Sequence, residues 1–191
     1  MELLTYLISG AVAGLMAGLL GIGGGLVIVP ALAMLFLHQG FSADTVMHYA
    51  VGTSLATIIL TSISSLLAHQ RRGSVYWPAV RQMAPGILLG ALASAWLAKQ
   101  MSSTVLALVF GVFLLLVAGQ LLLGAKPAPH RQLPGAVGLG ATGGVIGLVS
   151  GLLGIGGGTM TVPFLIWSRV DIRLAVGTAA TLGLPIAIAG T

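Results

Sequence analysis

The sequence predicts an all-α membrane protein, a polytopic bundle of transmembrane helices that is built from two similar repeats. Apolar residues make up 57% of the 191 residues and charged residues only 6%, whereas a soluble domain carries about 25% charged residues. Several apolar runs exceed the roughly 20 residues that a helix needs to cross a hydrocarbon core. A transmembrane β-barrel would alternate apolar and polar residues over strands of about 10 residues, and the sequence lacks that pattern.

Short stretches that carry charges and turn-forming residues divide the chain into six apolar segments. The segments cover residues 3–37, 50–69, 79–98, 104–124, 135–167 and 174–191. Residues 126–131 hold two prolines and two cations, and they form the most linker-like break. We therefore expect a first transmembrane repeat at 1–124 with about four segments, a cytoplasmic linker at 125–134 and a second repeat at 135–191.

The two halves repeat each other in sequence. When the first half is shifted by 133 positions, residues 10–32 align with residues 143–165, and 15 of these 23 positions are identical. They include the word GLLGIGGG, at 18–25 and 151–158, and the proline that follows it. The word AVGT, at 50–53, then returns at 175–178 in the same order. Because two separate motifs recur in the same order, the similarity indicates a true internal repeat rather than chance matches between low-complexity segments.

The first segment of each repeat is predicted to be a broken helix. A straight helix over residues 3–37 would be about 50 Å long, at 1.5 Å per residue, against a hydrocarbon core of about 30 Å. The glycine runs mark the breaks, at 21–25 and 154–158. An unwound backbone inside a membrane must be buried in protein or line a polar cavity, and many secondary transporters bind their substrates at such breaks.

Other glycines of these segments have a simpler explanation. Glycines four residues apart let two helices approach closely, and we interpret six of them as packing residues: Gly10, Gly14, Gly18, Gly143, Gly147 and Gly151. Three successive glycines exceed any packing need, so we interpret 23–25 and 156–158 as functional breaks. They do not match a phosphate-binding loop, because the required lysine and hydroxyl residue do not follow.

The second repeat shows only two of the four expected segments before the last residue. The repeat therefore predicts an incomplete second half, with two further helices in about 60 to 70 residues. We expect the 191-residue chain alone to be unstable and inactive in transport, unless dimerisation covers the exposed break. Simple alternation of crossings places five loop cations on one side of the membrane and three on the other, which favours a cytoplasmic N-terminus. The five are Arg71, Arg72, Arg81, Lys126 and Arg131, and the three are Lys99, Arg169 and Arg173. An even number of crossings per half would make the repeats parallel.

The duplicated motifs resemble those of a known family. A pair of G-x-G-G-G-x-x-x-x-P blocks in the first helix of each half, each followed by a helix with A-x-G-T, is similar to the sulfite exporter TauE/SafE family. The resemblance covers the whole chain and implies two four-helix repeats. It also implies transport of small sulfur-containing or organic anions such as sulfite, sulfonates and sulfoacetate, without choosing among them.

The chemistry of the residues also fits an anion. The three acidic residues are terminal or lie in loops, whereas a carrier of cations would place a carboxylate inside the bundle. The donors available in the membrane are hydroxyls and the backbone N–H groups of the breaks. The candidate hydroxyls are those of Thr53, Ser54, Thr57, Thr159, Thr161 and Thr178. The expected substrate-binding residues are Gly23, Gly24, Gly25, Thr53, Ser54, Gly156, Gly157, Gly158, Thr159 and Thr178.

We therefore predict a permease or secondary transporter for a small anion in the cell (inner) membrane. The alternatives are an anion channel and a structural or assembly protein that transports nothing. An enzyme is disfavoured, because no nucleophile with a base, metal motif or aspartate pair occurs in the segments. We expect no cofactor, no metal and no nucleic acid; the net charge of +5 reflects topology and lipid headgroups. The sequence is compatible with a coupling proton or ion and with a homodimer.

Overall fold

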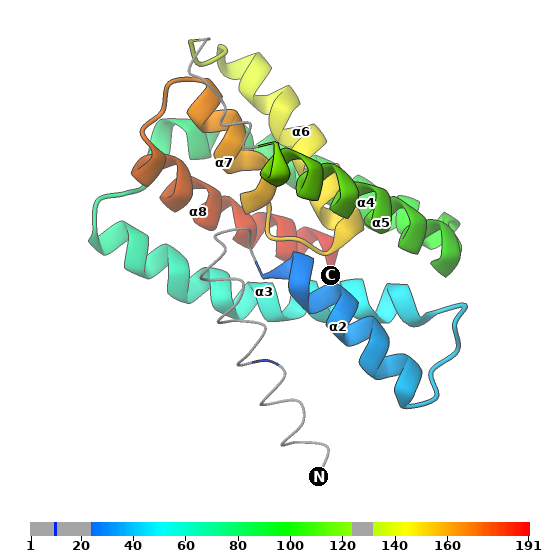
Figure 1. Ribbon diagram of the computed structural model, residues 1–191. Coiled ribbons are helices and arrows are strands. Elements are labelled where there is room, and N and C mark those ends of the chain that lie inside the picture. Colours follow the sequence, from blue (N-terminus) through cyan, green and yellow to red (C-terminus); the bar gives the residue numbers. More distant parts are fainter. Residues whose placement is uncertain (1–9, 11–23, 124–131) are drawn as a thin grey trace.

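All regular structure is helical in the part of the chain that the computed structural model describes, which is residue 10 and residues 24–123 and 132–191. The helices of these residues are α2 (Gly25–His38), α3 (Val46–Arg71), α4 (Trp77–Gln100), α5 (Ser103–Leu122), α6 (Ala136–Leu153), α7 (Gly158–Trp167) and α8 (Ile172–Gly190) (Figure 1). The all-α prediction is confirmed. Residues 21–23, which begin the first predicted break, lie outside the described residues.

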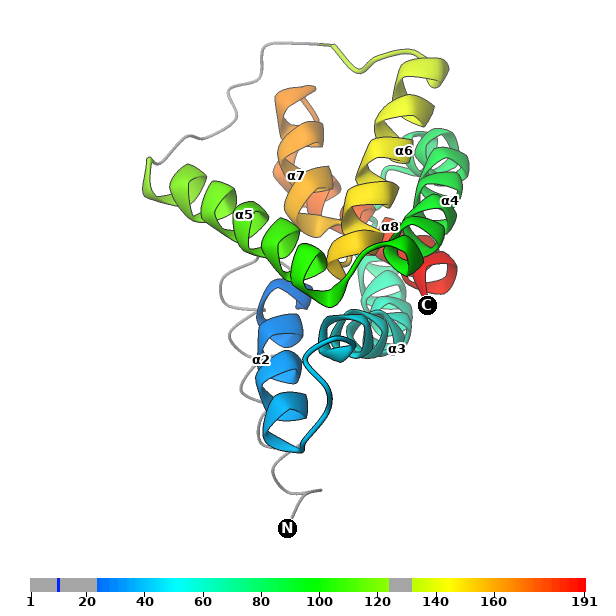
Figure 2. The ribbon, with the colours of Figure 1, turned by 90° about the vertical axis from the view of Figure 1, so that its right-hand side faces the viewer.

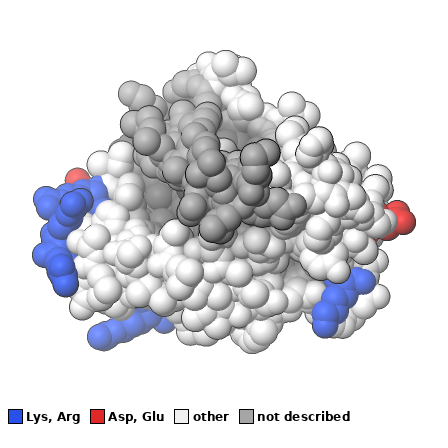
Figure 3. Space-filling view, turned by 90° about the horizontal axis from the view of Figure 1, so that it is seen from below, with Lys and Arg blue, Asp and Glu red and all other residues white. Residues whose placement is uncertain are grey.

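The helices have the length and surface of membrane spans. Helices α3, α5, α6 and α8 are long and apolar enough to cross a bilayer, and α2 and α7 are shorter apolar helices. Large apolar side chains cover the outside of the bundle: Leu60, Leu89 and Leu115 are 71%, 71% and 74% exposed. Lys, Arg, Asp and Glu gather at two opposite ends, with an uncharged band between them (Figure 3). This is the pattern of a polytopic membrane protein.

Helices α4 and α6 pack together most extensively, because glycines remove side chains from both surfaces. A Cβ added to Gly86 or Gly90 would overlap the carbonyl oxygens of Gly140 and Gly144, respectively. The packing glycines predicted in the second half lie along the same seam, each against α4. They are Gly143, Gly147 and Gly151. For these three residues the packing interpretation is confirmed.

Helices α3 and α8 run antiparallel. Near the start of α8, Gly177 lies against the carbonyl of Ser74, just beyond the end of α3. At the other end of α8, a Cβ on Gly190 would lie 3.0 Å from Cδ1 of Leu55, near the start of α3. These helices carry the two copies of AVGT, so the parallel relation expected for the two halves is wrong for this pair.

The physical reason is that the chain turns back at the second break. Helix α6 begins at the end of the bundle where α4 begins, and runs parallel to α4. Helix α7 then returns toward that same end (Figures 1 and 2), and a short turn at 168–171 leads into α8. The segment 135–167 is therefore a re-entrant pair of helices rather than a single crossing, and this changes the count of crossings.

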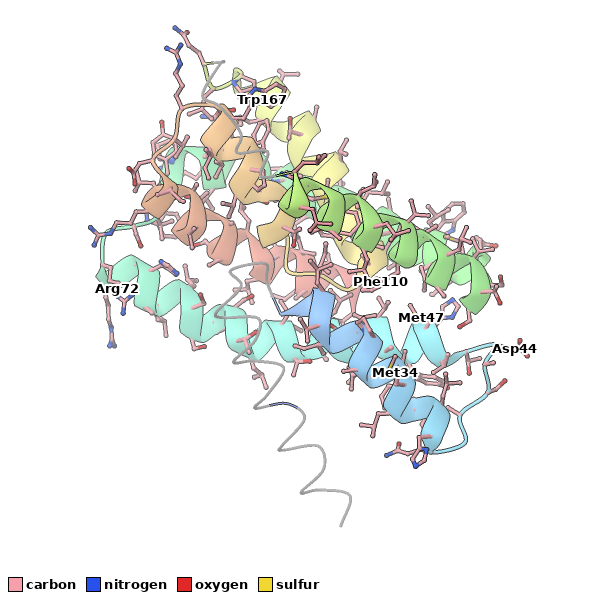
Figure 4. All side chains as sticks on the ribbon, viewed as in Figure 1. Met34, Asp44, Met47, Arg72, Phe110 and Trp167 are labelled. Carbon is pink, nitrogen blue, oxygen red and sulfur yellow. The ribbon has the colours of Figure 1, made fainter. Side chains whose placement is uncertain are left out.

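The re-entrant pair also changes the distribution of loop cations. The α7–α8 turn lies beside the α3–α4 turn, so five of the six described cations share one end: Arg71, Arg72, Arg81, Arg169 and Arg173. Lys99 lies in the last turn of α4 at the opposite end, where the Ala98 carbonyl is hydrogen-bonded to His48 near the start of α3. Asp44, just before α3, and Arg72 are labelled at opposite ends of the bundle in Figure 4. The expectation that Arg169 and Arg173 lie on the side of Lys99 is therefore wrong.

Candidate functional site

The second glycine break begins with a tight helix stop. Gly154 ends α6 in the left-handed conformation, with φ of 66°. Its N–H donates to the carbonyl of Gly151, and the N–H of Ile155 donates to the carbonyl of Ser150 at 2.9 Å. This pair of bonds is a Schellman motif, which satisfies carbonyls that the helix end would otherwise leave unpaired. The first glycine of the break therefore has a conformational role.

A second left-handed glycine starts α7. Gly157 has φ of 74°, and its carbonyl accepts the N–H groups of Met160 and Thr161, which form the first turn. An L side chain rarely adopts this conformation. Because two left-handed residues lie only three positions apart, the backbone reverses direction within residues 154–157. The glycine run thus produces the re-entrant turn.

The described part of the first break meets the second break. A Cβ added to Gly25, the first residue of α2, would overlap the carbonyl oxygen of Gly154 and lie 2.6 Å from Cα of Ile155. The hydroxyl of Ser54, on α3, donates to that same carbonyl of Gly154 at 2.8 Å. Three elements from different parts of the chain therefore converge on one peptide group.

Residues 154, 155 and 157 of the break are buried, and residues 156 and 158 are partly buried. The exposed break expected from the sequence is therefore not found, and with it goes the reason to expect an unstable chain that does not transport. Ile58 of α3 lies 3.5 Å from the Cβ position of Gly156, and the Gly156 carbonyl lies against Gly183 of α8. Two isoleucines, Ile186 of α8 and Ile146 of α6, lie near Gly157. This arrangement meets the requirement that unwound backbone at membrane depth be buried by neighbouring helices.

Both short helices begin at this place without a capping side chain. Gly24 precedes α2 and Gly157 precedes α7, and neither position makes a side-chain cap hydrogen bond. The two N-termini face the centre of the bundle from opposite directions (Figures 1 and 2). The first N–H groups of a helix have no partner within the helix, and its N-terminus carries about half a positive charge. Such ends suit an anion.

The structure separates the predicted hydroxyl residues. Ser54 is fully buried and bonded to Gly154, as described above. Thr53 is exposed on α3. Thr178 is fully buried, and its hydroxyl accepts the backbone N–H of Tyr76 at 2.9 Å, just before α4 begins. Thr159, in the first turn of α7, is partly buried. Of these four, Ser54 and Thr159 lie at the break.

Sequence reasoning did not select Ser150. Its side chain is fully buried in the last turn of α6, beside the break. The repeat aligns Ser150 with an alanine at position 17, so the internal comparison gave no reason to choose it. Thr161 was weighed as a hydroxyl but was not among the expected binding residues, and it too is fully buried.

The polar groups around the break are neutral. In the described chain, Lys, Arg, Asp and Glu lie at the two ends of the bundle (Figure 3). The same residues contain no group of three His, Asp or Glu that could hold a metal. A surface hollow of about 650 Å³ is lined by Ile166, Arg169, Val170 and Asp171 at the α7–α8 turn. It lies at the charged end and not at the break.

Taken together, the fold and the break define a polytopic helical membrane protein with a discontinuous helix at its centre, an architecture typical of secondary transporters. The chain belongs to the sulfite exporter TauE/SafE family, whose model matches residues 6–191. It is a membrane transporter of this family.

Its relatives come from bacteria and archaea. It is 36% identical to a probable membrane transporter protein of Haemophilus influenzae, over 98% of this chain and 72% of that protein. The probable membrane transporter protein YunE of Bacillus subtilis is 32% identical, over 85% and 67% of the two chains. MJ0441 of Methanocaldococcus jannaschii, with the same description, is 28% identical, over 89% and 64%. No solved structure matches the chain.

Proposed function

We propose that the chain is a permease that carries a small anion across the cell membrane, with its substrate site between the starts of α2 and α7. The observation that carries this proposal is the contact between the uncapped N-terminus of α2 and the turn that leads into the uncapped N-terminus of α7, where Gly25 lies against the Gly154 carbonyl. Two such ends bring backbone N–H donors and positive potential to the same turn. The proposed site residues there are Gly24, Gly25, Gly156, Gly157, Gly158 and Thr159.

The substrates we propose are sulfite, sulfonates and related organosulfur or organic anions. The family description names sulfite, and the neutral donors around the break suit a compact oxyanion. Buried Ser54 supports the site by bonding the Gly154 carbonyl, and Thr178 supports the start of α4. Gly23, the remaining proposed site glycine, lies outside the described residues. A homodimer and a coupling proton or ion are compatible with this proposal.

The test is flux measured with the purified chain in liposomes. We expect saturable uptake of radiolabelled sulfite, inhibited by thiosulfate and methanesulfonate and unaffected by tetramethylammonium, because helix N-termini repel a cation. Saturation would separate a carrier from an open channel. Uptake no faster than in empty liposomes, for every anion of the panel, would contradict the proposal and favour a structural role.

We also propose that the end with Arg71 and Arg72 faces the cytoplasm. Five of the six described cations lie at this end, and short cytoplasmic loops carry an excess of Lys and Arg. Because the chain contains no cysteine, single cysteines can report the topology. In bacterial spheroplasts, we expect a membrane-impermeant maleimide to label Lys99→Cys and to label Arg72→Cys only after permeabilisation. The opposite order of labelling would reverse the orientation.

A further inference from the structure

Two buried hydroxyls beside the break lack hydrogen-bond partners. Ser150 and Thr161 are both fully buried, and neither hydroxyl oxygen has a partner among the described residues. Several other buried hydroxyls of the described residues are paired. Ser94 donates to the Ala91 carbonyl at 2.7 Å, and Thr181 donates to the Gly177 carbonyl at 2.9 Å. Folded proteins rarely leave such groups unpaired, because each one loses its bonds to water.

Ser150 and Thr161 lie on the two sides of the glycine turn, one in the last turn of α6 and one in α7. Thr161 is one turn into α7, and side chains on a helix tilt toward its N-terminus. Its Oγ1 is 3.6 Å from the position that a Cβ on Gly157 would occupy, so the hydroxyl lies at the uncapped start of α7. Ser150 lies across the turn, in the last turn of α6, where its carbonyl closes the Schellman motif with Ile155.

We infer that Ser150 and Thr161 bind the transported anion by donating their hydroxyl protons to its oxygens. This inference rests on the proposed function and adds two residues to its site. The start of α7 has no capping side chain, and an anion bound there would accept hydrogen bonds from both hydroxyls. A bound anion would thus give the hydroxyls of Ser150 and Thr161 the hydrogen-bond acceptor that the protein does not supply among its described residues.

The described state is closed around this place. A Cβ on Gly157 would lie 2.5 Å from Cδ1 of Ile186 and 3.9 Å from Cγ2 of Ile146. These are the ends of flexible side chains, so their movement can admit a small ligand without unfolding the neighbouring helices. A glycine at 157 keeps this space free of a side chain of its own.

The chemistry of the donors specifies a compact oxyanion. Separate hydroxyl and N–H donors on two helices match an anion that presents separate oxygens, as a sulfite, sulfonate or carboxylate group does. A halide ion is a single atom, so all of these donors would have to bind the same acceptor. We therefore expect sulfite to bind in preference to chloride.

Thr161→Val and Ser150→Ala test the inference, with Thr181→Val and Ser94→Ala as matched controls. The purified chains are compared by melting temperature, with and without sodium sulfite, and by the KM of sulfite flux. Removing an unpaired hydroxyl leaves no partner unsatisfied. We therefore expect Thr161→Val and Ser150→Ala to keep or raise the melting temperature without sulfite. We expect each to shrink the shift caused by sulfite and to raise KM about tenfold.

The controls are expected to do the reverse. Thr181→Val and Ser94→Ala each lose a buried hydrogen bond, so the melting temperature should fall while KM stays at the wild-type value. Wild-type KM in both Thr161→Val and Ser150→Ala, with sulfite transported, would overturn this inference and leave the proposed function standing. A wild-type chain that neither transports nor is stabilised by any anion of the panel would overturn both.

Discussion

Replacement of Gly90 by leucine is expected to prevent the chain from forming its helix bundle. Even a methyl group at this position would overlap the carbonyl oxygen of Gly144 and lie 2.8 Å from the backbone nitrogen of Leu148. Both atoms belong to helical backbone, so neither can move without separating α4 from α6. Overpacking alone costs about 1 to 3 kcal/mol, and separation of the most extensive helix pair in the described chain adds to it.

The measurement is the yield of monodisperse protein in detergent and its thermal unfolding. Gly111→Leu is the matched control, because Gly111 lies within α5 and a Cβ there would meet nothing within 4 Å. We expect Gly111→Leu to match the wild type and Gly90→Leu to aggregate or to melt far below it. A Gly90→Leu protein with wild-type yield and melting temperature would show that α4 and α6 do not pack as described.

The packing of the second half could be predicted from the sequence, but its partner could not. Spacing of four residues marked Gly143, Gly147 and Gly151 as one helix face, and all three lie against α4. The partner surface includes Gly86 and Gly90, which sequence reasoning did not select. The choice of partner depends on how distant helices fit together, and one sequence holds no direct signal for that.

The position of the break could also be predicted, but not the path of the chain through it. Segment 135–167 is too long for one straight crossing, so it must break, and its glycine run marks the position of the break. The direction of α7 depends on two backbone angles, the positive φ values of Gly154 and Gly157. Glycine permits such values and equally permits ordinary ones. The sequence is therefore compatible both with a kinked helix that crosses the membrane once and with a re-entrant turn. The expectation that the two halves are parallel assumes the kinked crossing, and it is wrong because the turn is re-entrant.

The repeated threonines show why a sequence repeat does not predict a shared environment. Thr53 and Thr178 follow the same Val-Gly pair, yet Thr178 is fully buried and Thr53 is exposed. Helix α4 packs against α8, and the N–H of Tyr76, just before α4, is bonded to Thr178 near the start of α8. Gly52 precedes Thr53 as Gly177 precedes Thr178. Gly52 has no close neighbour, since a Cβ there would meet nothing within 4 Å. Burial is a property of the neighbouring helices and not of the motif.

The substitution Gly25→Ala is expected to abolish transport by separating the two breaks. The added methyl group would overlap the carbonyl oxygen of Gly154 and crowd Cα of Ile155 at 2.6 Å. Because the obstacle is backbone, α2 must move away from the turn, and the Gly154 carbonyl must shift relative to Ser54, which donates to it. Overpacking together with the loss of that buried hydrogen bond costs about 3 kcal/mol.

Flux of sulfite in liposomes and thermal unfolding measure the two consequences of Gly25→Ala separately. Gly52→Ala serves as the control, since an added Cβ at that position of α3 meets nothing within 4 Å, and alanine favours the helix. We expect Gly52→Ala to transport like the wild type, and Gly25→Ala to melt at a lower temperature and to show no flux. The loss of flux should persist at temperatures where the variant is still folded, because the N-termini of α2 and α7 would no longer face one shared point. If folded Gly25→Ala transports sulfite at the wild-type rate, the site cannot depend on the contact between the two breaks.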